Sequence, residues 1–233
     1  MNRAFGASEA IGQAMLAKAD QAGVAHMGFF RQSTGTTATP MILVDDLMDE
    51  SKLSSAIEQA LVHGLPDQIF IATGFLHNQT WQPEKTFKAL NETQMLASFQ
   101  INTVLPSLIV KHCVQALPRK HRVNIGVVSA RVGSISDNRM GGWHSYRASK
   151  AALNMLVKNF AIEFANKYPK INIVALQPGT TDSALSKPFQ SYLPKGQLQS
   201  PKRTAQLLWQ VITSDLSSEN GQLIDFHKKV ILP

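Results

Sequence analysis

A tyrosine and a lysine spaced to share one face of a helix are the residues of this sequence best placed to do chemistry. Tyr146 and Lys150 are four residues apart, so in a helix their side chains lie on the same side, one turn apart. An ammonium beside a phenol favours the phenolate and lowers a pKa of about 10 toward the working range of a general acid or base. At this spacing a plain surface contact is the more common outcome, so the function depends on what surrounds the pair.

The pair stands at the start of a stretch with the apolar spacing of a helix that packs on two sides. Its larger apolar side chains step by three, four and four residues and predict a helix over 146–167. The core face of this helix would hold Leu153, Leu156, Phe160 and Phe164. A second, shallower apolar face would hold Ala148, Ala151, Ala152 and Met155.

Around this helix, short apolar runs alternate with amphipathic stretches. The runs are apolar on both faces, as buried parallel strands are, and cover 24–30, 41–44, 69–72, 123–128 and 171–176. A short polar strand is expected at 2–5 and an edge strand at 221–226. Helices are predicted over 11–22, 51–63, 92–117, 146–167 and 201–213. This alternation predicts an α/β fold, a single-domain Rossmann-type doubly wound parallel sheet with helices on both faces.

Composition narrows the class of protein. The 233 residues, 44% hydrophobic and 17% charged, have an ordinary globular composition and can form one domain, residues 1–233. There is no apolar run of about 18 residues and no signal-peptide core, so no membrane partner and a cytoplasmic location are expected. The single cysteine, Cys113, lies among aliphatic residues and is expected to be a core thiol, which fits a reducing compartment.

The net charge of +7 could reflect an anionic ligand or a solvated basic surface. The densest basic cluster, residues 119–122, has no aromatic side chain beside it and falls between a predicted helix and a predicted strand. A nucleic acid partner is therefore not expected. No metal site is expected either.

Two segments resemble the short-chain dehydrogenase/reductase family. Tyr146-Arg-Ala-Ser149-Lys150-Ala-Ala-Leu-Asn is similar to the active-site helix of the family, and Ser129-Ala-Arg-Val-Gly133-Ser134-Ile resembles its serine segment. The likeness covers nearly the whole chain and, within the family, is to the subgroup of carbonyl reductases that includes Sniffer and C-factor. It implies an oxidoreductase that moves hydride between a nicotinamide cofactor and a carbonyl or alcohol. Tyr146 would protonate the substrate oxygen, Lys150 would lower the pKa of Tyr146 and bind the nicotinamide ribose, and a serine would steady the substrate oxygen.

The resemblance leaves the identity of that serine open. The family places it three residues before the glycine that follows the fifth strand, and in this chain Ala130 stands three residues before Gly133. Ser129 is one residue earlier and could serve only if the strand has already ended, because adjacent strand residues point to opposite faces. Ser134 lies twelve residues before Tyr146, close to the usual family separation, in a loop free to curl inward. Both serines remain candidates.

The first strand-to-helix turn resembles the glycine-rich turn that holds the pyrophosphate of a dinucleotide. The segment 6–12, Gly6-Ala-Ser8-Glu9-Ala10-Ile11-Gly12, has the expected first and last glycines, with Ala10 in place of the middle one. Gly6 would make the tight turn, and backbone N–H groups from Ser8 through Ala10 to Ile11 would face the phosphates. Glu9 adds a negative charge near the proposed phosphates. The alternative is a tight turn that holds no ligand.

Further cofactor contacts are implied at the ends of the next strands. Arg31 follows the second predicted strand, where an arginine accommodates the 2′-phosphate of NADP and an acidic residue holds the ribose of NAD. NADP is therefore favoured over NAD, with a solvated loop arginine as the alternative. By resemblance, Asp46 would accept from the adenine amine and Leu47 would pack on the ring. Gly74 would let the backbone approach the cofactor ribose.

The segment 177–183 resembles the Pro-Gly turn of the family. Pro178 and Gly179 form the turn, and by resemblance the backbone near Thr181 and the hydroxyl of Ser183 would hold the nicotinamide carboxamide. The next residues, 184–199, are the longest piece without periodicity and are expected to form a lid over the substrate. The side chains that could wall an apolar substrate there are Phe189, Tyr192 and Leu193, with packing on the protein core as the equal alternative.

The predicted helix 92–117 contains a polar residue and a proline in mid-course. Asn102 between apolar neighbours, with Pro106 following, predicts a local break, because proline cannot donate to the preceding turn. By resemblance, Asn102 would hold a water that links Lys150 to solvent. On the residues alone, a surface asparagine is the alternative.

The family likeness also implies partners and leaves a second function open. The helices at 92–117 and 146–164 would pair with their copies in a homodimer or homotetramer, and the small-molecule substrate would be a carbonyl or alcohol. The alternative function is a dinucleotide-binding sensor or a weakly active protein with the same fold. It arises because Glu9, Ala10 and Ala130 depart from the family pattern.

Overall fold

The computed structural model describes residues 1–31 and 40–233. Seven strands form one sheet in the order β3-β2-β1-β4-β5-β6-β9, and each neighbouring pair is parallel. This is the doubly wound order that the sequence predicts. The strands are β1 (Asn2–Phe5), β2 (His26–Phe30), β3 (Met41–Leu43), β4 (Gln68–Ile71), β5 (Val123–Val128), β6 (Ile171–Gln177) and β9 (Leu223–Asp225).

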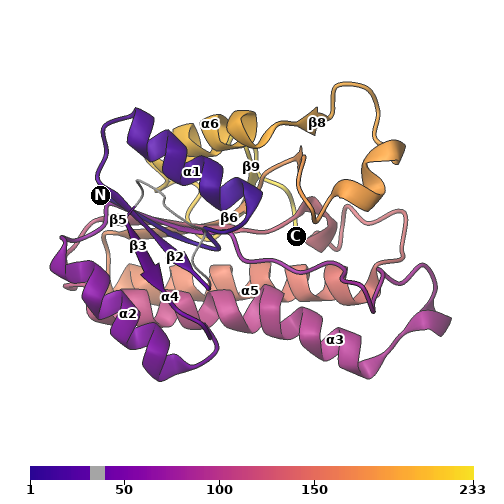
Figure 1. Cartoon of the computed structure of the whole chain (residues 1–233), viewed down its shortest axis with the longest axis horizontal. Helices are drawn as coiled ribbons and strands as arrows, with labels where there is room; N and C mark the ends of the chain where they lie inside the picture. The colour runs from indigo at the N-terminus through magenta and orange to yellow at the C-terminus, as the bar shows by residue number, and fades with distance from the viewer. Residues whose placement is uncertain (32–39) are drawn as a thin grey trace.

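Helices cover both faces of the sheet (Figure 1). One face carries α1 (Ala10–Gln21) and α6 (Pro201–Ile212), and the other carries α2 (Glu50–Val62), α3 (Glu92–Phe99), α4 (Leu105–Ala116) and α5 (His144–Lys167). The strands between these layers bury apolar side chains on both sides, which explains their continuous apolar runs. The carboxyl ends of the strands therefore meet at one edge of the sheet, where the loops that follow them come together.

The polar first strand lies at the centre of the sheet, between β2 and β4. Arg3 is buried there, and its guanidinium donates to the carbonyl oxygens of Ala60 (2.6 Å) and Gly64 (2.9 Å) at the end of α2. The last carbonyls of a helix lack partners within it and carry the negative end of its dipole. Arg3 can therefore be buried in a central strand, because its guanidinium is hydrogen-bonded to carbonyl oxygens at the end of α2.

The break predicted in the long helix is present. A π-helical turn, η2 (Gln100–Val104), separates α3 from α4. Asn102 lies within this turn and is fully buried, so it is not a surface asparagine. A π turn in a long helix often marks a functional position, because the extra residue redirects a side chain.

Two predictions about α5 and the segment after β6 need correction. The buried stripe of α5 is Leu153, Val157, Ala161 and Phe164, whereas Leu156 is only partly buried. The segment 184–199 is not wholly irregular, because it contains the 3₁₀ helix η4 (Lys187–Tyr192) and ends in β8 (Leu198–Gln199). β8 pairs in parallel with β7 (Thr180–Thr181), so both ends of the segment are held together. η4 and β8 are too short for an apolar periodicity to be recognised in the sequence.

Cys113 is buried in the main core, as predicted, and burial raises the pKa of its thiol. Across the described residues, no helix combines the length and the apolar character needed to cross a membrane.

Candidate active site

Tyr146 and Lys150 lie together on α5, as their spacing predicts. The Lys150 ammonium nitrogen is 5.9 Å from the centre of the Tyr146 ring. It donates a hydrogen bond of 3.0 Å to the carbonyl oxygen of Val128, the last residue of β5. Lys150 is 2% exposed, and Tyr146 is partly exposed. The pair therefore lies at the carboxyl edge of the central sheet, where ligands of doubly wound folds bind.

Burial determines the protonation states of both groups. It raises the pKa of Tyr146 to about 12 and lowers the pKa of Lys150 to about 7, because each charged form loses hydration. The expectation that the lysine lowers the pKa of the tyrosine is therefore not met in this structure. Desolvation outweighs attraction, and the amine bonds to a carbonyl oxygen rather than to the phenol. At neutral pH the Tyr146 hydroxyl keeps its proton.

Asn102 joins the turn after β4 to α5. Its amide oxygen accepts from the Phe75 N–H (2.8 Å), and its amide nitrogen donates to the Phe75 carbonyl oxygen (2.8 Å) and to the Ser149 hydroxyl (3.1 Å). Thr103, the next residue of the π turn, donates to the Ser149 carbonyl oxygen (2.8 Å). The π turn thus holds the helix segment immediately before Lys150.

The two candidate serines have different surroundings. β5 ends at Val128, so Ser129 lies just beyond the strand, which was the condition for its use. Its hydroxyl donates to the side-chain oxygen of Asn154 (2.6 Å), one helical turn beyond Lys150. The Ser134 hydroxyl donates to the Leu232 carbonyl oxygen and accepts from the Asp137 N–H (3.1 Å). Ser134 therefore ties its own loop to the C-terminal residues.

The glycine-rich turn has the shape that a dinucleotide pyrophosphate needs. Gly6 has φ of +72°, and a Cβ on it would lie 2.8 Å from the backbone of Ala72. A Cβ on Gly12 would lie 2.2 Å from the Gly6 carbonyl oxygen, so α1 can approach the strand only with glycine there. Ala10 is the first residue of α1, where helical φ suits any residue. Glu9 makes no side-chain cap, which leaves the first N–H groups of α1 to a ligand.

The residues predicted to bind the rest of the cofactor lie at the same edge. Arg31 is exposed at the end of β2 and borders residues 32–39, which are outside the described chain. Asp46 is exposed and accepts from the Met48 N–H (2.8 Å). Leu47 packs in the main core, which leaves little of it to cover an adenine ring. Gly74 is exposed in the turn after β4.

Thr73 is a residue that the sequence analysis did not single out. Its hydroxyl is buried and has no hydrogen-bond partner among the described residues. It lies against the glycine-rich turn, because a Cβ on Gly6 would be 3.1 Å from the Thr73 nitrogen. An unpaired buried hydroxyl costs free energy unless a ligand or water bonds to it, and a sugar hydroxyl would satisfy it. Together with the glycine-rich turn, Thr73 makes this edge fit a nucleotide.

The Pro-Gly turn follows β6 and is closely packed. Pro178 is buried, and Gly179 has φ of +75°. A Cβ on Gly179 would lie 2.6 Å from the side-chain nitrogen of Gln199, so there is no room for one. The Thr181 hydroxyl lies 2.8 Å from that of Thr204, so only its backbone is left for a ligand. Ser183 is partly exposed, and the bonds of its hydroxyl are long: it lies 3.3 Å from the Thr181 carbonyl oxygen, accepts from the Ser186 N–H at 3.3 Å and lies 3.4 Å from the Ser186 hydroxyl.

Four rings form a row that starts at Tyr146. Trp143 meets the Tyr146 ring edge-on at 6.2 Å, Phe189 of η4 lies 4.9 Å from Trp143, and His77 lies 5.6 Å from Phe189. The His77 side chain also bonds to the Leu185 carbonyl oxygen (3.1 Å). Phe189 was predicted to face the substrate, and His77 was missed because one histidine in a loop carries no pattern. Tyr192 was also predicted there, but it is 84% exposed.

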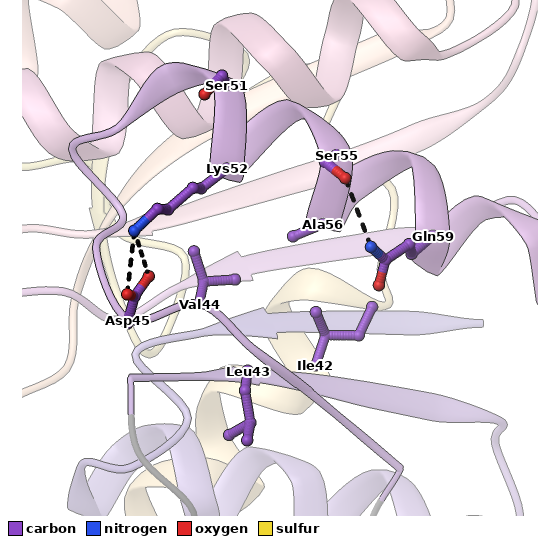
Figure 2. Close-up of a pocket in the computed structure, with 9 residues that line it drawn as sticks. All are labelled: Ile42, Leu43, Val44, Asp45, Ser51, Lys52, Ser55, Ala56 and Gln59. Atoms are coloured by element: carbon purple, nitrogen blue, oxygen red, sulfur yellow. Dashed lines mark hydrogen bonds and ion pairs between the residues drawn. The ribbon is translucent and has the colours of Figure 1, made fainter.

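A separate hollow of about 380 Å³ lies between β3 and α2 (Figure 2). Figure 2 shows the Lys52 ammonium bonding to both carboxylate oxygens of Asp45 at 3.0 Å, and Gln59 bonding to Ser55. Asp45 adjoins Asp46, but the lining includes none of the residues predicted to act in catalysis or to bind the cofactor. The hollow is therefore distinct from the candidate active site.

Comparison with known proteins places this geometry in a family. The profile of the family described as short chain dehydrogenase matches residues 4–193. Benzil reductase ((S)-benzoin forming) of Bacillus subtilis is 24% identical over an alignment of 241 positions, which covers 94% of this chain and 95% of that protein. The 1-hydroxy-2-glutathionyl-2-methyl-3-butene dehydrogenase of Rhodococcus sp. is 36% identical over 90 residues, only 39% of this chain and 38% of that protein.

Solved structures have the same fold. Carbonyl reductase Sniffer of D. melanogaster superimposes with a TM-score of 0.83 at 17% identity, covering 100% of this chain and 98% of that one. The NADPH-bound carbonyl reductase from chicken fatty liver gives a TM-score of 0.81 at 18% identity, with coverages of 100% and 98%. The family profile spans most of the chain, from the central strand β1 to the end of η4. The chain belongs to the short-chain dehydrogenase/reductase family of NAD(P)-dependent oxidoreductases.

Proposed function

We propose that this protein is an NADP(H)-dependent carbonyl reductase. The observation that carries the proposal is the Tyr146–Lys150 pair held against the end of β5, at the edge of the sheet that also bears the glycine-rich turn. A bound nicotinamide cofactor would supply the hydride. The residues of this chain would then bind the cofactor, orient the carbonyl group and supply the proton.

Reduction is the direction that the tyrosine favours. With a pKa of about 12, Tyr146 is protonated at neutral pH and can donate. The oxygen of a carbonyl that has received hydride is an alkoxide, a far stronger base than a phenolate, so transfer from the phenol is favourable. Oxidation of an alcohol would need the phenolate, which burial disfavours. Tyr146 is therefore assigned as the general acid.

Three further residues would support this step. Lys150 donates to a backbone carbonyl oxygen at the end of β5, a place from which its amine would also reach a ribose hydroxyl. Both serine hydroxyls have partners, but Ser129 is the better candidate for the serine that steadies the substrate oxygen. It directly follows β5, where Lys150 is also held, and bonds to Asn154 of the same helix as Lys150, whereas Ser134 bonds to the C-terminal Leu232. Asn102 lies between Phe75 and Ser149 and would hold the water of the proton relay.

The cofactor site is assigned to the amino end of α1 and the turns beside it. Gly6, the Ser8 N–H in the turn and the first N–H groups of α1, at Ala10 and Ile11, would bind the pyrophosphate, and Thr73 and Gly74 would face a ribose. The exposed Arg31 would pair with the 2′-phosphate of NADP. The other contacts that we propose are those of Asp46 with the adenine, to which the core-packed Leu47 would add no more than its exposed edge, and those of Pro178, Gly179, Thr181 and Ser183 with the nicotinamide.

The substrate class that we propose is a ketone with an aromatic substituent. Trp143 and Phe189 continue the row of rings that begins at Tyr146, and aromatic rings favour stacked and edge-on contacts with one another. A flat ring next to the reacting carbonyl would find such contacts along this row. The similarity to a benzil reductase supports this substrate class.

A homodimer or homotetramer is proposed on the side of the molecule formed by α3, α4 and α5. These helices bear exposed apolar side chains that face away from the sheet, and their covering would remove this apolar area from water. The residues are Leu96 of α3, Val104 of the π turn η2 between α3 and α4, and Met155 and Ile162 of α5.

The first test is binding and turnover with Tyr146→Phe. We expect the protein to bind NADPH more tightly than NADH in a fluorescence titration and to reduce benzil or a related aryl ketone. Tyr146→Phe should lower kcat about 10²- to 10⁴-fold, the range for loss of a general acid, while the affinity for NADPH stays within about threefold. Tight NADPH binding without turnover of a broad carbonyl panel would favour the dinucleotide-binding sensor instead.

Matched serine variants test the assignment of the serine. Ser129→Ala should lower kcat by about tenfold or more, whereas Ser134→Ala should leave kcat nearly unchanged and lower the thermal stability. Equal losses of kcat, or a larger loss in Ser134→Ala, would reverse the assignment.

A further inference from the structure

Glu84 is a buried carboxylate that neither the sequence motifs nor the proposed reaction uses. It lies in the loop between β4 and α3 and is 2% exposed. Among the described residues, no lysine, arginine or histidine lies within ion-pair distance of it. A buried charge without a counter-ion is costly unless hydrogen bonds and dipoles stabilise it, so its partners indicate why it is there.

All of the described partners of Glu84 belong to the start of α5. The side-chain carboxylate of Glu84 accepts from the Ser145 hydroxyl and from the Ser145 N–H (3.3 Å). Its backbone carbonyl oxygen accepts from the Trp143 N–H. The first N–H groups of a helix have no partners within it, and the amino end of the helix dipole attracts negative charge. Trp143, the residue before the helix, makes no side-chain cap, so Glu84 does the capping from 61 residues away in sequence.

The backbone at this point is strained. Trp143 has φ of +51°, one of two non-glycine residues with positive φ in the described chain, and Gly141 and Gly142 before it also have positive φ. Left-handed backbone at a bulky residue persists only where its surroundings enforce it. The bond from the Trp143 N–H to the backbone carbonyl oxygen of Glu84 is one such constraint. The Glu84 carboxylate adds a second one by holding Ser145, two residues further on, and the backbone fixed in this way carries the indole that contacts both Tyr146 and Phe189.

We infer that Glu84 is a positioning residue for the proposed reaction. Its carboxylate fixes the first turn of α5, and that turn sets where the hydroxyl of Tyr146 and the ring of Trp143 stand. Glu84 touches neither substrate nor cofactor in this role. Because the inference rests on the proposed function, its test includes a measurement that does not depend on turnover.

The test compares Glu84→Ala and Glu84→Gln with Gln94→Ala in the full-length chain. Gln94 is buried and donates to the Gln82 carbonyl oxygen (2.9 Å), so it holds the same loop but not through α5. Glu84→Ala should lower kcat for an aryl ketone about 10- to 100-fold, while the dissociation constant of NADPH changes less than threefold. Glu84→Gln keeps one side-chain acceptor for Ser145, so its kcat should fall less than that of Glu84→Ala. Gln94→Ala should keep kcat within about threefold.

Hydrogen exchange of the α5 amides separates this inference from the proposed function. Without cofactor or substrate, the N–H groups at residues 145–148 should exchange faster in Glu84→Ala than in the parent protein, and those at 155–165 should not. If Glu84→Ala does not fold, Ser145→Ala removes the hydroxyl partner and should show the same pattern more weakly. Unchanged exchange at 145–148, or an equal loss of kcat in Gln94→Ala, would overturn the inference. A parent protein that reduces no ketone but shows the local change in exchange would refute the proposed function alone.

Discussion

At the scale of single residues, burial rather than charge pairing controls the candidate active site. The spacing of Tyr146 and Lys150 suggested an ammonium that lowers the pKa of a phenol, whereas the structure shows both groups shifted toward their neutral forms. The cause is the same for both, since the protein around them replaces water that would solvate a charge. A site with these protonation states is suited to donate a proton rather than to accept one.

The lowered pKa of Lys150 predicts a pH dependence of stability. In the unfolded chain its pKa returns to about 10.5, so between pH 7 and 10 the unfolded chain binds more protons than the folded protein. The free energy of unfolding should therefore rise with pH in this window, by at most about 1.4 kcal/mol per pH unit from this group. Lys150→Met removes the titrating group, so its stability should rise less steeply between pH 7 and 9.

Urea unfolding of the parent protein and of Lys150→Met, both without cofactor, at pH 7, 8 and 9 measures the difference in how steeply their stability rises with pH. The other titrating groups are the same in the two proteins. The limit of pH 9 avoids Tyr146, whose raised pKa makes stability fall between about pH 10 and 12. Parallel pH profiles would contradict the buried, largely neutral lysine.

At the scale of elements, three separate segments converge on the reacting end of α5. The loop after β4 contributes His77, the loop that leads into α5 contributes Trp143, and η4 contributes Phe189. η4 belongs to a segment whose two ends are joined by the β7–β8 pairing, while its middle contacts the site through Phe189 and Leu185. In the proposed reaction, η4 would therefore be the element that covers the substrate.

Phe189→Ala should weaken substrate binding more than catalysis. Removing the ring deletes contacts with Trp143 and His77, and aromatic contacts of this kind contribute about 0.5–1.5 kcal/mol each. We expect KM for an aryl ketone to rise about 3- to 10-fold, with kcat and NADPH affinity little changed. Steady-state kinetics measure this, and Tyr192→Ala, an exposed ring in the same short helix, is the control. Equal effects of the two variants would show that Phe189 does not line the substrate.

At the scale of the whole molecule, the two helical layers differ in what they leave exposed. Figure 1 shows the two layers on opposite faces of the sheet. The layer of α1 and α6 closes over a small apolar core of its own, whereas α3 and α5 in the other layer retain exposed apolar side chains. Met155 and Ile162 are seven residues apart on α5, and thus on one side of the helix two turns apart. α5 already packs on the sheet through its other side, so this exposed apolar surface favours packing against a second copy of the protein.

Met155→Asp should therefore shift the protein toward the monomer. Met155 is 61% exposed, so the substitution would leave the fold of a single chain intact and place a charge in the proposed interface. Light scattering coupled to size-exclusion chromatography measures the mass of each form. Val62→Asp, at an exposed apolar residue of α2, should keep the parent mass. A monomeric parent protein at micromolar concentration would contradict the proposed assembly.

The sequence by itself determined the order of strands and helices, a local break in the helix near Asn102, the placement of Tyr146 beside Lys150, and the tight turn at Gly6. These features depend on residues a few positions apart, where period, proline and glycine act locally. Only the tertiary structure decided the charge states of the pair, the engagement of Ser134 with Leu232, the capping role of Arg3 and the contacts of His77 and Glu84. Each of these joins residues more than 20 positions apart in the chain, as Glu84 and Ser145 are by 61 and Ser134 and Leu232 by 98. Burial and partner choice at such distances arise only when the layers pack, because no local pattern encodes which distant surface will exclude water.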